Sequence, residues 1–150
     1  SGGVGSVVRQ SYRCMPYQPG KGLLVLATFV MDSSNSANLT QRVGYFNSQN
    51  GVFFQRVDGT YSFVLRSYIT GSVSDARTVT QANWNGDKLD GTGESGLTLD
   101  PSKAQILWMD FEWLGVGSVR CGFISSGQSR KATVLEPPRP GRGHTCASRY

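Results

Sequence analysis

The stretch from Ile106 to Phe123 has the clearest alternation of positions in the chain. Apolar side chains occupy every second position of its first arm, at Leu107, Met109, Phe111 and Trp113, and the positions between them carry Trp108, Asp110 and Glu112. A period of two is typical of a strand with one buried face. Gly115-Val116-Gly117 fits a three-residue hairpin loop, because glycine adopts the positive φ that such loops need. This loop predicts a register in which Glu112 faces Arg120 and Met109 faces Phe123.

Six further segments have the pattern of strands between turns rich in glycine, asparagine and proline: 7–15, 23–31, 40–46, 52–57, 60–66 and 73–80. Segment 23–31 is apolar on both parities, which predicts a central strand covered on both faces. Asp58-Gly59 predicts a two-residue hairpin with Phe54 opposite Phe63, and segment 73–80 continues it as a meander. We therefore expect an all-β fold with little helix, an antiparallel two-sheet sandwich of jelly-roll or concanavalin-like type.

Composition agrees with one β domain, which we place at residues 1–125. The 150 residues include 19 glycines and only 17% charged side chains. No run approaches the roughly 18 apolar residues that span a bilayer, so we expect no membrane partner. The start, Ser1-Gly2-Gly3, has neither an initiator methionine nor a signal-peptide pattern, which predicts a processed or excised piece.

The net charge of +5 is unevenly distributed. Residues 126–150 hold five basic side chains against Glu136, whereas the remaining residues carry ten basic and nine acidic ones. Phosphate binding needs clustered basic side chains, so we expect no nucleic-acid binding through the folded body. Pro137, Pro138 and Pro140 cannot donate ladder hydrogen bonds, which predicts an extended basic tail over 126–150.

Two explanations fit this tail. It is an arm that contacts a neighbouring subunit through its basic side chains, Arg130, Lys131, Arg139 and Arg142, or its reading frame shifted near Ile124. The unpaired edges of a sandwich, together with the tail, predict a homo-oligomer, with a trimer favoured.

The longest irregular stretch, Gln81 to Gly96, is the first candidate for a binding site. Its carboxylates at Asp87, Asp90 and Glu94 offer calcium ligands, but their spacing fits turn capping better than a calcium loop. We therefore expect no metal and no cofactor. Trp84 is predicted to fill the core beneath the loop; the alternative is an exposed platform for a sugar or a partner.

Asp110 and Glu112 are the strongest catalytic candidates. Two carboxylates at positions i and i+2 of a strand lie ~6.5–7 Å apart, within reach of acid/base chemistry. A salt bridge from Arg120 makes such a carboxylate a poor general acid, so we expect no catalytic residue. His144 has no partners of catalytic type around it.

Cysteine usage also bears on the environment of the protein. Cys14, Cys121 and Cys146 cannot all pair within one chain, and Cys121 falls on the predicted buried parity of its strand. This usage favours assembly in a reducing compartment.

A chain-long order of turns and aromatic residues carries a resemblance over roughly residues 9–124. Its main parts are Pro19-Gly20-Lys21, Val43-Gly44-Tyr45-Phe46-Asn47, Asn50-Gly51-Val52-Phe53-Phe54, Trp84-Asn85, Asp90-Gly91-Thr92-Gly93 and Asp110-Phe111-Glu112-Trp113-Leu114-Gly115-Val116-Gly117. This order resembles a module of structural proteins of tailed bacteriophages and large algal viruses. The layout is also similar to concanavalin-like jelly rolls, whose sheets often carry lectins and glycosidases. The chain departs from the module after Ile124.

The resemblance implies a non-enzymatic virion structural protein, a capsid-associated decoration or fibre subunit assembled in the host cytoplasm. Such a subunit would self-associate and dock on other virion proteins. The alternative is a lectin-like module that binds a host receptor or glycan, with candidate contacts at Trp84, Asp87, Asp90 and Trp108. A second alternative is a glycan-cleaving enzyme that uses Asp110 and Glu112.

Overall fold

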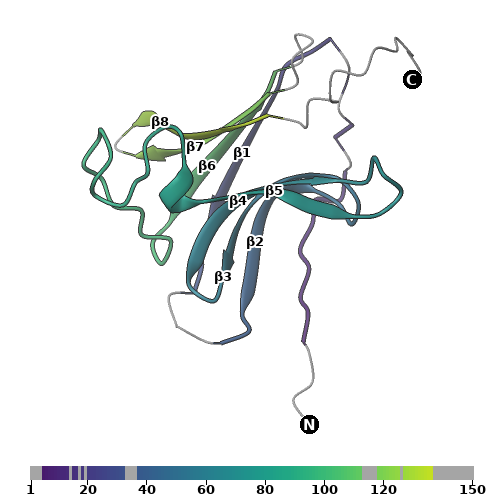
Figure 1. The fold of residues 1–150 in the computed structure, drawn as a ribbon, viewed down its shortest axis with the longest axis horizontal. Coiled ribbons are helices and arrows are strands. Elements are labelled where there is room, and N and C mark those ends of the chain that lie inside the picture. The colour runs from purple at the N-terminus through teal and green to yellow at the C-terminus, as the bar shows by residue number, and fades with distance from the viewer. Residues whose placement is uncertain are drawn as a thin grey trace.

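The computed structural model describes residues 5–13, 15, 16, 18, 20–32, 37–112, 118–125 and 127–136. Within them lie strands β1 (Leu23–Phe29), β2 (Thr40–Phe46), β3 (Gly51–Val57), β4 (Thr60–Ser67), β5 (Ser74–Thr80), β6 (Gln105–Phe111), β7 (Val119–Ser125) and β8 (Gln128–Leu135). One antiparallel sheet has the order β1-β6-β7-β8 and the other the order β2-β3-β4-β5. The sheets pack face to face, so the predicted all-β two-sheet sandwich is confirmed (Figure 1).

The second sheet is a meander of four consecutive strands. Asp58 and Gly59 have φ of 47° and 84°, the positive values that a two-residue hairpin turn requires. The hairpin places Phe54 opposite Phe63, as predicted, with ring centroids 5.3 Å apart. Strand β5 then continues the meander, also as predicted.

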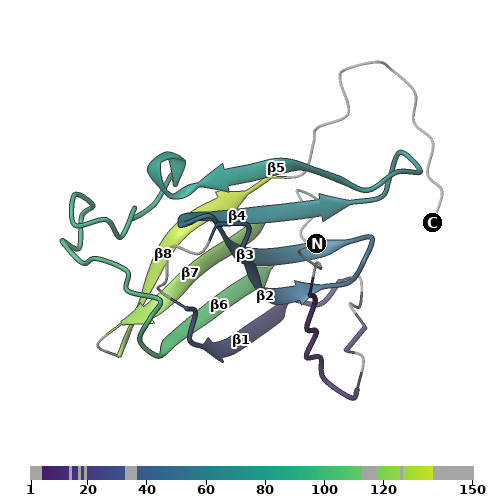
Figure 2. The same cartoon turned by 90° about the horizontal axis from the view of Figure 1, so that it is seen from below.

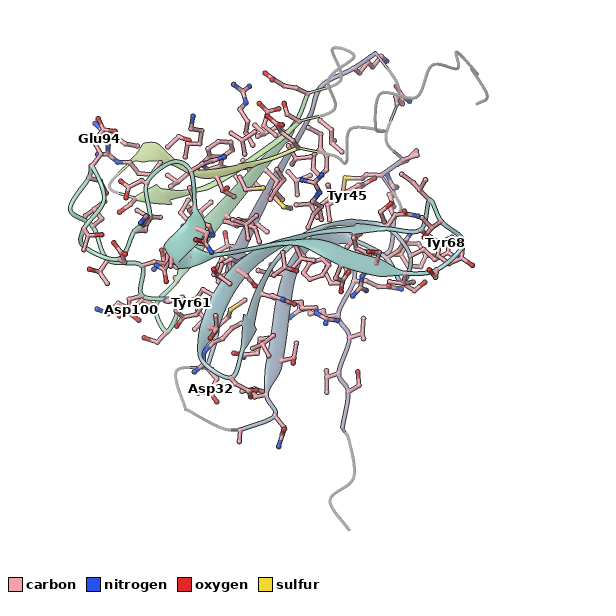
Figure 3. All side chains as sticks on the ribbon, in the orientation of Figure 1. Asp32, Tyr45, Tyr61, Tyr68, Glu94 and Asp100 are labelled. Carbon is pink, nitrogen blue, oxygen red and sulfur yellow. The ribbon has the colours of Figure 1, made fainter. Side chains whose placement is uncertain are left out.

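The core lies between the sheets and is rich in aromatic rings. Phe54 and Phe123 come from different sheets, and their rings meet edge to face with centroids 5.2 Å apart. Tyr45 of β2 lies between the layers, and its ring meets that of Phe111 of β6 edge to face, with centroids 5.6 Å apart (Figure 3). Each fully buried large apolar side chain contributes about 1.5–3 kcal/mol, so this cluster supplies most of the free energy that holds the sheets together.

Among the described residues, no helix is long and apolar enough to cross a membrane.

The hairpin between β6 and β7 forms, but its predicted register is wrong by two residues. Asp110 faces Arg120 and Met109 faces Cys121, instead of Glu112 facing Arg120 and Met109 facing Phe123. The amide of Glu112 donates to the carbonyl of Ser118 at 3.3 Å, and the predicted loop residues, Gly115-Val116-Gly117, lie outside the described residues. A shift of two keeps every side chain on its predicted face, because successive side chains alternate.

Two predictions about the first strands are wrong. Residues 7–13, predicted as part of a strand, form no strand in the structure, and Val7 and Val8 are exposed. Strand β1 forms but is not central: it pairs with β6 on one side only. Leu24 and Leu26 on its outer face are 61% and 58% exposed.

The predicted tail begins too early. Residues 128–135 form β8, which pairs with β7 and buries Ala132, Thr133 and Leu135. The prolines that argue against a strand all follow Leu135, so they do not affect this segment. The sandwich therefore extends past residue 125. Residues 137–150, with Arg139 and Arg142, lie outside the described residues.

Candidate functional site

The outer face of the β1-β6-β7-β8 sheet gathers most of the candidate residues. On β6, Leu107 and Met109 point into the core, so the alternating positions 108 and 110 point outward. The register sets Leu26 beside Trp108 and Gly122 on its other side. We call this surface the Trp108 face; it comprises Leu24, Leu26, Ile106, Trp108, Asp110, Glu112, Arg120 and Gly122.

Trp108 lies across Gly122 of the neighbouring strand. A Cβ atom added to Gly122 would be 2.8 Å from both Cε2 and Cζ2 of the indole and 2.0 Å from the carbonyl oxygen of Arg130. Only glycine lets the indole and the β8 backbone approach this closely. The indole Nε1 is buried and has no hydrogen-bond partner among the described residues. The indole therefore packs directly against the backbone at Gly122.

A three-residue ion cluster adjoins the indole. Nη2 of Arg120 donates to Oδ2 of Asp110 at 2.6 Å and also contacts Oε1 of Glu112. The hydrogen bond to Asp110, followed by the charges of Glu112 and Asp110, outweighs desolvation and raises the pKa of Arg120. The predicted contact between Glu112 and Arg120 is present, and Asp110 joins it. One guanidinium thus fixes both carboxylates and presents them at the surface beside Trp108.

The carboxylates of the 81–96 loop are used within the loop. Oδ1 of Asp87 accepts the Leu89 amide at 3.0 Å, and Oδ2 accepts the Ser95 amide at 2.9 Å. Burial acts to raise the pKa of Asp87, but the hydrogen bonds from Ser95 and Leu89 prevail and lower it. Asp90 accepts both the amide and the hydroxyl of Thr92, at 2.9 and 2.6 Å. These are turn-capping contacts. The described residues hold no group of three or more His, Cys, Asp or Glu side chains placed to bind a metal.

Trp84 belongs to the core and not to an open site. It is 3% exposed, contacts the rings of Phe63 and Phe123, and donates from Nε1 to the Val79 carbonyl at 3.2 Å. The prediction of a core plug is confirmed, and the alternative of an exposed platform is wrong. Trp84 and Trp108 therefore lie in different environments, one inside the sandwich and one on its outer face.

The same loop also contacts the edge of β8, which the sequence does not reveal. The amides of Gly86 and Asp87 donate to the carbonyls of Ala132 and Lys131, both at 2.9 Å. Oδ1 of Asn85 accepts the amide of Val134 at 2.9 Å. A Cβ at position 86 would lie 2.5 Å from the Lys131 carbonyl, so the glycine allows this approach. The sequence Asn85-Gly86-Asp87 gives no specific indication of this contact, because it is equally typical of an ordinary turn.

The basic candidates of the predicted tail that can be placed lie on β8. Arg130 donates from Nη2 to Oε1 of Gln128 at 2.7 Å, and Lys131 is exposed. Arg130 also lines a cavity of about 20 Å³ beneath the loop, together with Leu89, Leu99 and Phe123. That volume holds about one water molecule, so the cavity is too small for a sugar.

Comparisons with protein-family models, curated proteins and solved structures found no match to this chain. The features that bear on function are therefore the Trp108 face and the edge strands of the two sheets.

Proposed function

We propose that the protein is a non-enzymatic structural subunit that acts by self-association, of the kind that builds a virion. The observation that carries this proposal is β1, an edge strand of sequence Leu-Leu-Val-Leu-Ala-Thr-Phe with no charged residue. Its Leu24 and Leu26 side chains are both more than half exposed. An apolar edge strand offers unpaired backbone groups and apolar surface to another chain.

The virion part of the proposal rests on the resemblance of residues 9–124 to structural proteins of phages and algal viruses. As a capsid-associated decoration or fibre subunit, the protein would dock on other virion proteins in the host cytoplasm. A sandwich fold is compatible with this role but does not by itself define a function, because many unrelated functions use it.

The proposal is tested by multi-angle light scattering on the full chain over a concentration series. We expect a discrete oligomer whose population grows with concentration. A monomer at every concentration would contradict self-association.

A second candidate, a lectin-like module, is favoured by the Trp108 face. The face of an indole stacks on apolar faces of ligands, and an adjacent guanidinium and carboxylates can hydrogen bond sugar hydroxyls. Calorimetric titration with β-glucan and alginate oligosaccharides tests it. A lectin would lose its binding heat in Trp108→Ala and keep it in Tyr68→Ala, because Tyr68 lies at the turn after β4, on the other sheet (Figure 3). An absence of binding heat with every one of these oligosaccharides would contradict a lectin for this class of sugar.

The glycan-cleaving alternative uses Asp110 and Glu112. Because Arg120 holds both carboxylates, we expect no release of reducing sugar from β-glucan or alginate. Turnover that is lost in Glu112→Gln would establish the glycosidase in place of the structural role.

A further inference from the structure

The edge of β8 is already occupied within the chain. Residues 85–87 run along it and donate two backbone hydrogen bonds to the carbonyls of Lys131 and Ala132. Pairing with β7 is also irregular, because the register shifts between Cys121 and Gly122. Covering loops and irregularities are devices that keep an edge strand from pairing with another chain.

The two edges of the other sheet carry charge. Strand β5 has Asp75 and Arg77, and its register against β4 shifts between Leu65 and Ser67. Strand β2 has the exposed Arg42, whose guanidinium lies over the Phe53 ring at 5.3 Å on the outer face. A second chain that paired with either edge would have to accommodate these charges.

Strand β1 lacks all of these devices. It has no charged residue, no proline and no glycine, and it pairs with β6 in an unbroken register from Leu23 to Phe29. No described residue hydrogen bonds along its other side. Figure 2 shows β1 as the outermost strand of its sheet, at the lower margin of the sandwich. Of the four edges, β1 alone is regular, apolar and open in the described structure.

We infer that β1 pairs antiparallel with β1 of a second copy around a two-fold axis at Leu26, and this inference rests on the proposed self-association. A two-fold axis perpendicular to the sheet places the core-facing surfaces of both copies on the same face of the joined sheet. A register centred on Leu26, the middle of the strand, pairs all seven residues. It sets Leu26 against its own copy and Leu24 against Thr28 of the partner copy. Other centres leave part of β1 unpaired.

The result is one continuous sheet of eight strands with a joint outer surface. The two Leu26 side chains meet at its centre, each Leu24 faces Thr28 of the other copy, and Trp108 lies next to Leu26 on each side. The cross-strand apolar pairs stabilise the contact, in addition to the apolar area that leaves water. Closed two-fold pairing leaves no β1 edge exposed, so the contact gives a dimer instead of the trimer that the sequence favoured.

The first test changes the charge at the axis. Leu26→Lys places two ammonium groups opposite each other, which opposes pairing. We expect light scattering to shift from dimer to monomer, with an unchanged circular dichroism spectrum. The control is Ile69→Lys, which removes an 85% exposed apolar side chain from the β4–β5 turn and should leave the dimer intact.

The second test reads the register by cross-linking in a Cys14→Ser/Cys146→Ser background, where Cys121 is buried. Opposite residues have Cβ atoms about 4.5–5.5 Å apart, close to the span of a disulfide. Leu26→Cys should therefore give a covalent dimer on mild oxidation. Leu24→Cys should not, because position 24 and its copy lie four residues apart along the strand, about 13 Å.

The outcomes separate this inference from the function it rests on. A wild-type chain that is monomeric at every concentration overturns both. An oligomer that persists in Leu26→Lys and is not cross-linked through Leu26→Cys overturns only the β1 contact. Cross-linking through Leu24→Cys and not through Leu26→Cys overturns the register. Loss of the dimer in Leu26→Lys, together with cross-linking at position 26 alone, supports the inference.

Discussion

Replacing Gly122 by alanine probes how Trp108 is held on the sheet. The new methyl group would lie 2.0 Å from the Arg130 carbonyl and 2.8 Å from two indole carbons, all well inside van der Waals contact. The indole can rotate away, but the carbonyl belongs to the β8 backbone, so strand pairing has to shift. Added groups in a well-packed site cost about 1–3 kcal/mol. Because the backbone must move, we expect the free energy of unfolding to fall by about 3 kcal/mol, the upper end of this range.

The assay is urea unfolding followed by circular dichroism, with tryptophan fluorescence as a second probe. The matched control is Gly22→Ala, directly before β1, where the nearest atom to the new Cβ is the Phe111 carbonyl oxygen at 3.9 Å. That is ordinary contact, so its free energy of unfolding should stay within about 0.5 kcal/mol of wild type.

A Gly122→Ala variant as stable as Gly22→Ala would refute the reasoning, because it would mean that neither the indole nor β8 lies against position 122. The double variant Gly122→Ala/Trp108→Ala separates the two contacts. Without the indole, only the clash with the Arg130 carbonyl remains, so the penalty of the alanine should become smaller but not vanish.

Three further changes test other parts of the structure. Arg66 donates two hydrogen bonds of 2.8 Å to Asp75, and these lower the pKa of that carboxyl more than burial raises it. The pair therefore stabilises the fold above about pH 4, the ordinary range of the group, and this stability is lost as pH falls through the lowered pKa. In pH-dependent urea unfolding, Asp75→Asn should cost on the order of 1 kcal/mol at pH 7 and little at low pH; an equal cost at both would contradict the linkage. Burial raises the pKa of the Cys121 thiol, so the thiol should resist alkylation at neutral pH and react only on unfolding. Mass spectrometry of a chain that lacks the other two cysteines follows the reaction, and rapid labelling of the native chain would show an open core. A chain that ends at Ser125 lacks β8 and should lose its native circular dichroism, whereas one that ends at Glu136 should fold; a folded shorter chain would restore the predicted boundary.

The meander of β2 to β5 was predictable because its information is local. Asp58-Gly59 determines both the turn and the register, so the pairing of Phe54 with Phe63 followed directly. The sequence between β6 and β7 has no Asp-Gly or Asn-Gly pair, and its two glycines, Gly115 and Gly117, allow loops of different length. Alternation preserved the face of each residue there, but the register was wrong by two positions.

The position of β1 could not be read from its sequence. Apolar residues on both parities indicate that both faces are covered, but they do not distinguish cover within the chain from cover by another chain. Leu24 and Leu26 are exposed in the single copy, so any cover over this face has to come from another chain. The tail prediction was wrong for a related reason, because averaging over 126–150 hid the apolar positions of β8 among later prolines.

The candidate site was only partly predictable for the same physical reason. That Trp108, Asp110 and Glu112 share a face follows from alternation along one strand. That the indole rests on Gly122 follows from pairing across strands, which depends on the register that was mispredicted. The capping role of Asp87 was predictable because its partners lie within the same loop.

The order of strands in the β1 sheet has a consequence for folding kinetics. The meander joins neighbours in sequence, and such hairpins close in about 1–10 μs. Strand β1 pairs with β6, and the entire meander lies between them along the chain. Closing so long a loop costs more entropy, so we expect β1 to dock after the other sheet has formed. On a ribosome, β1 is made first but waits for the last strands to emerge. During that interval the most apolar strand has two open sides, and refolding yield should fall as protein concentration rises.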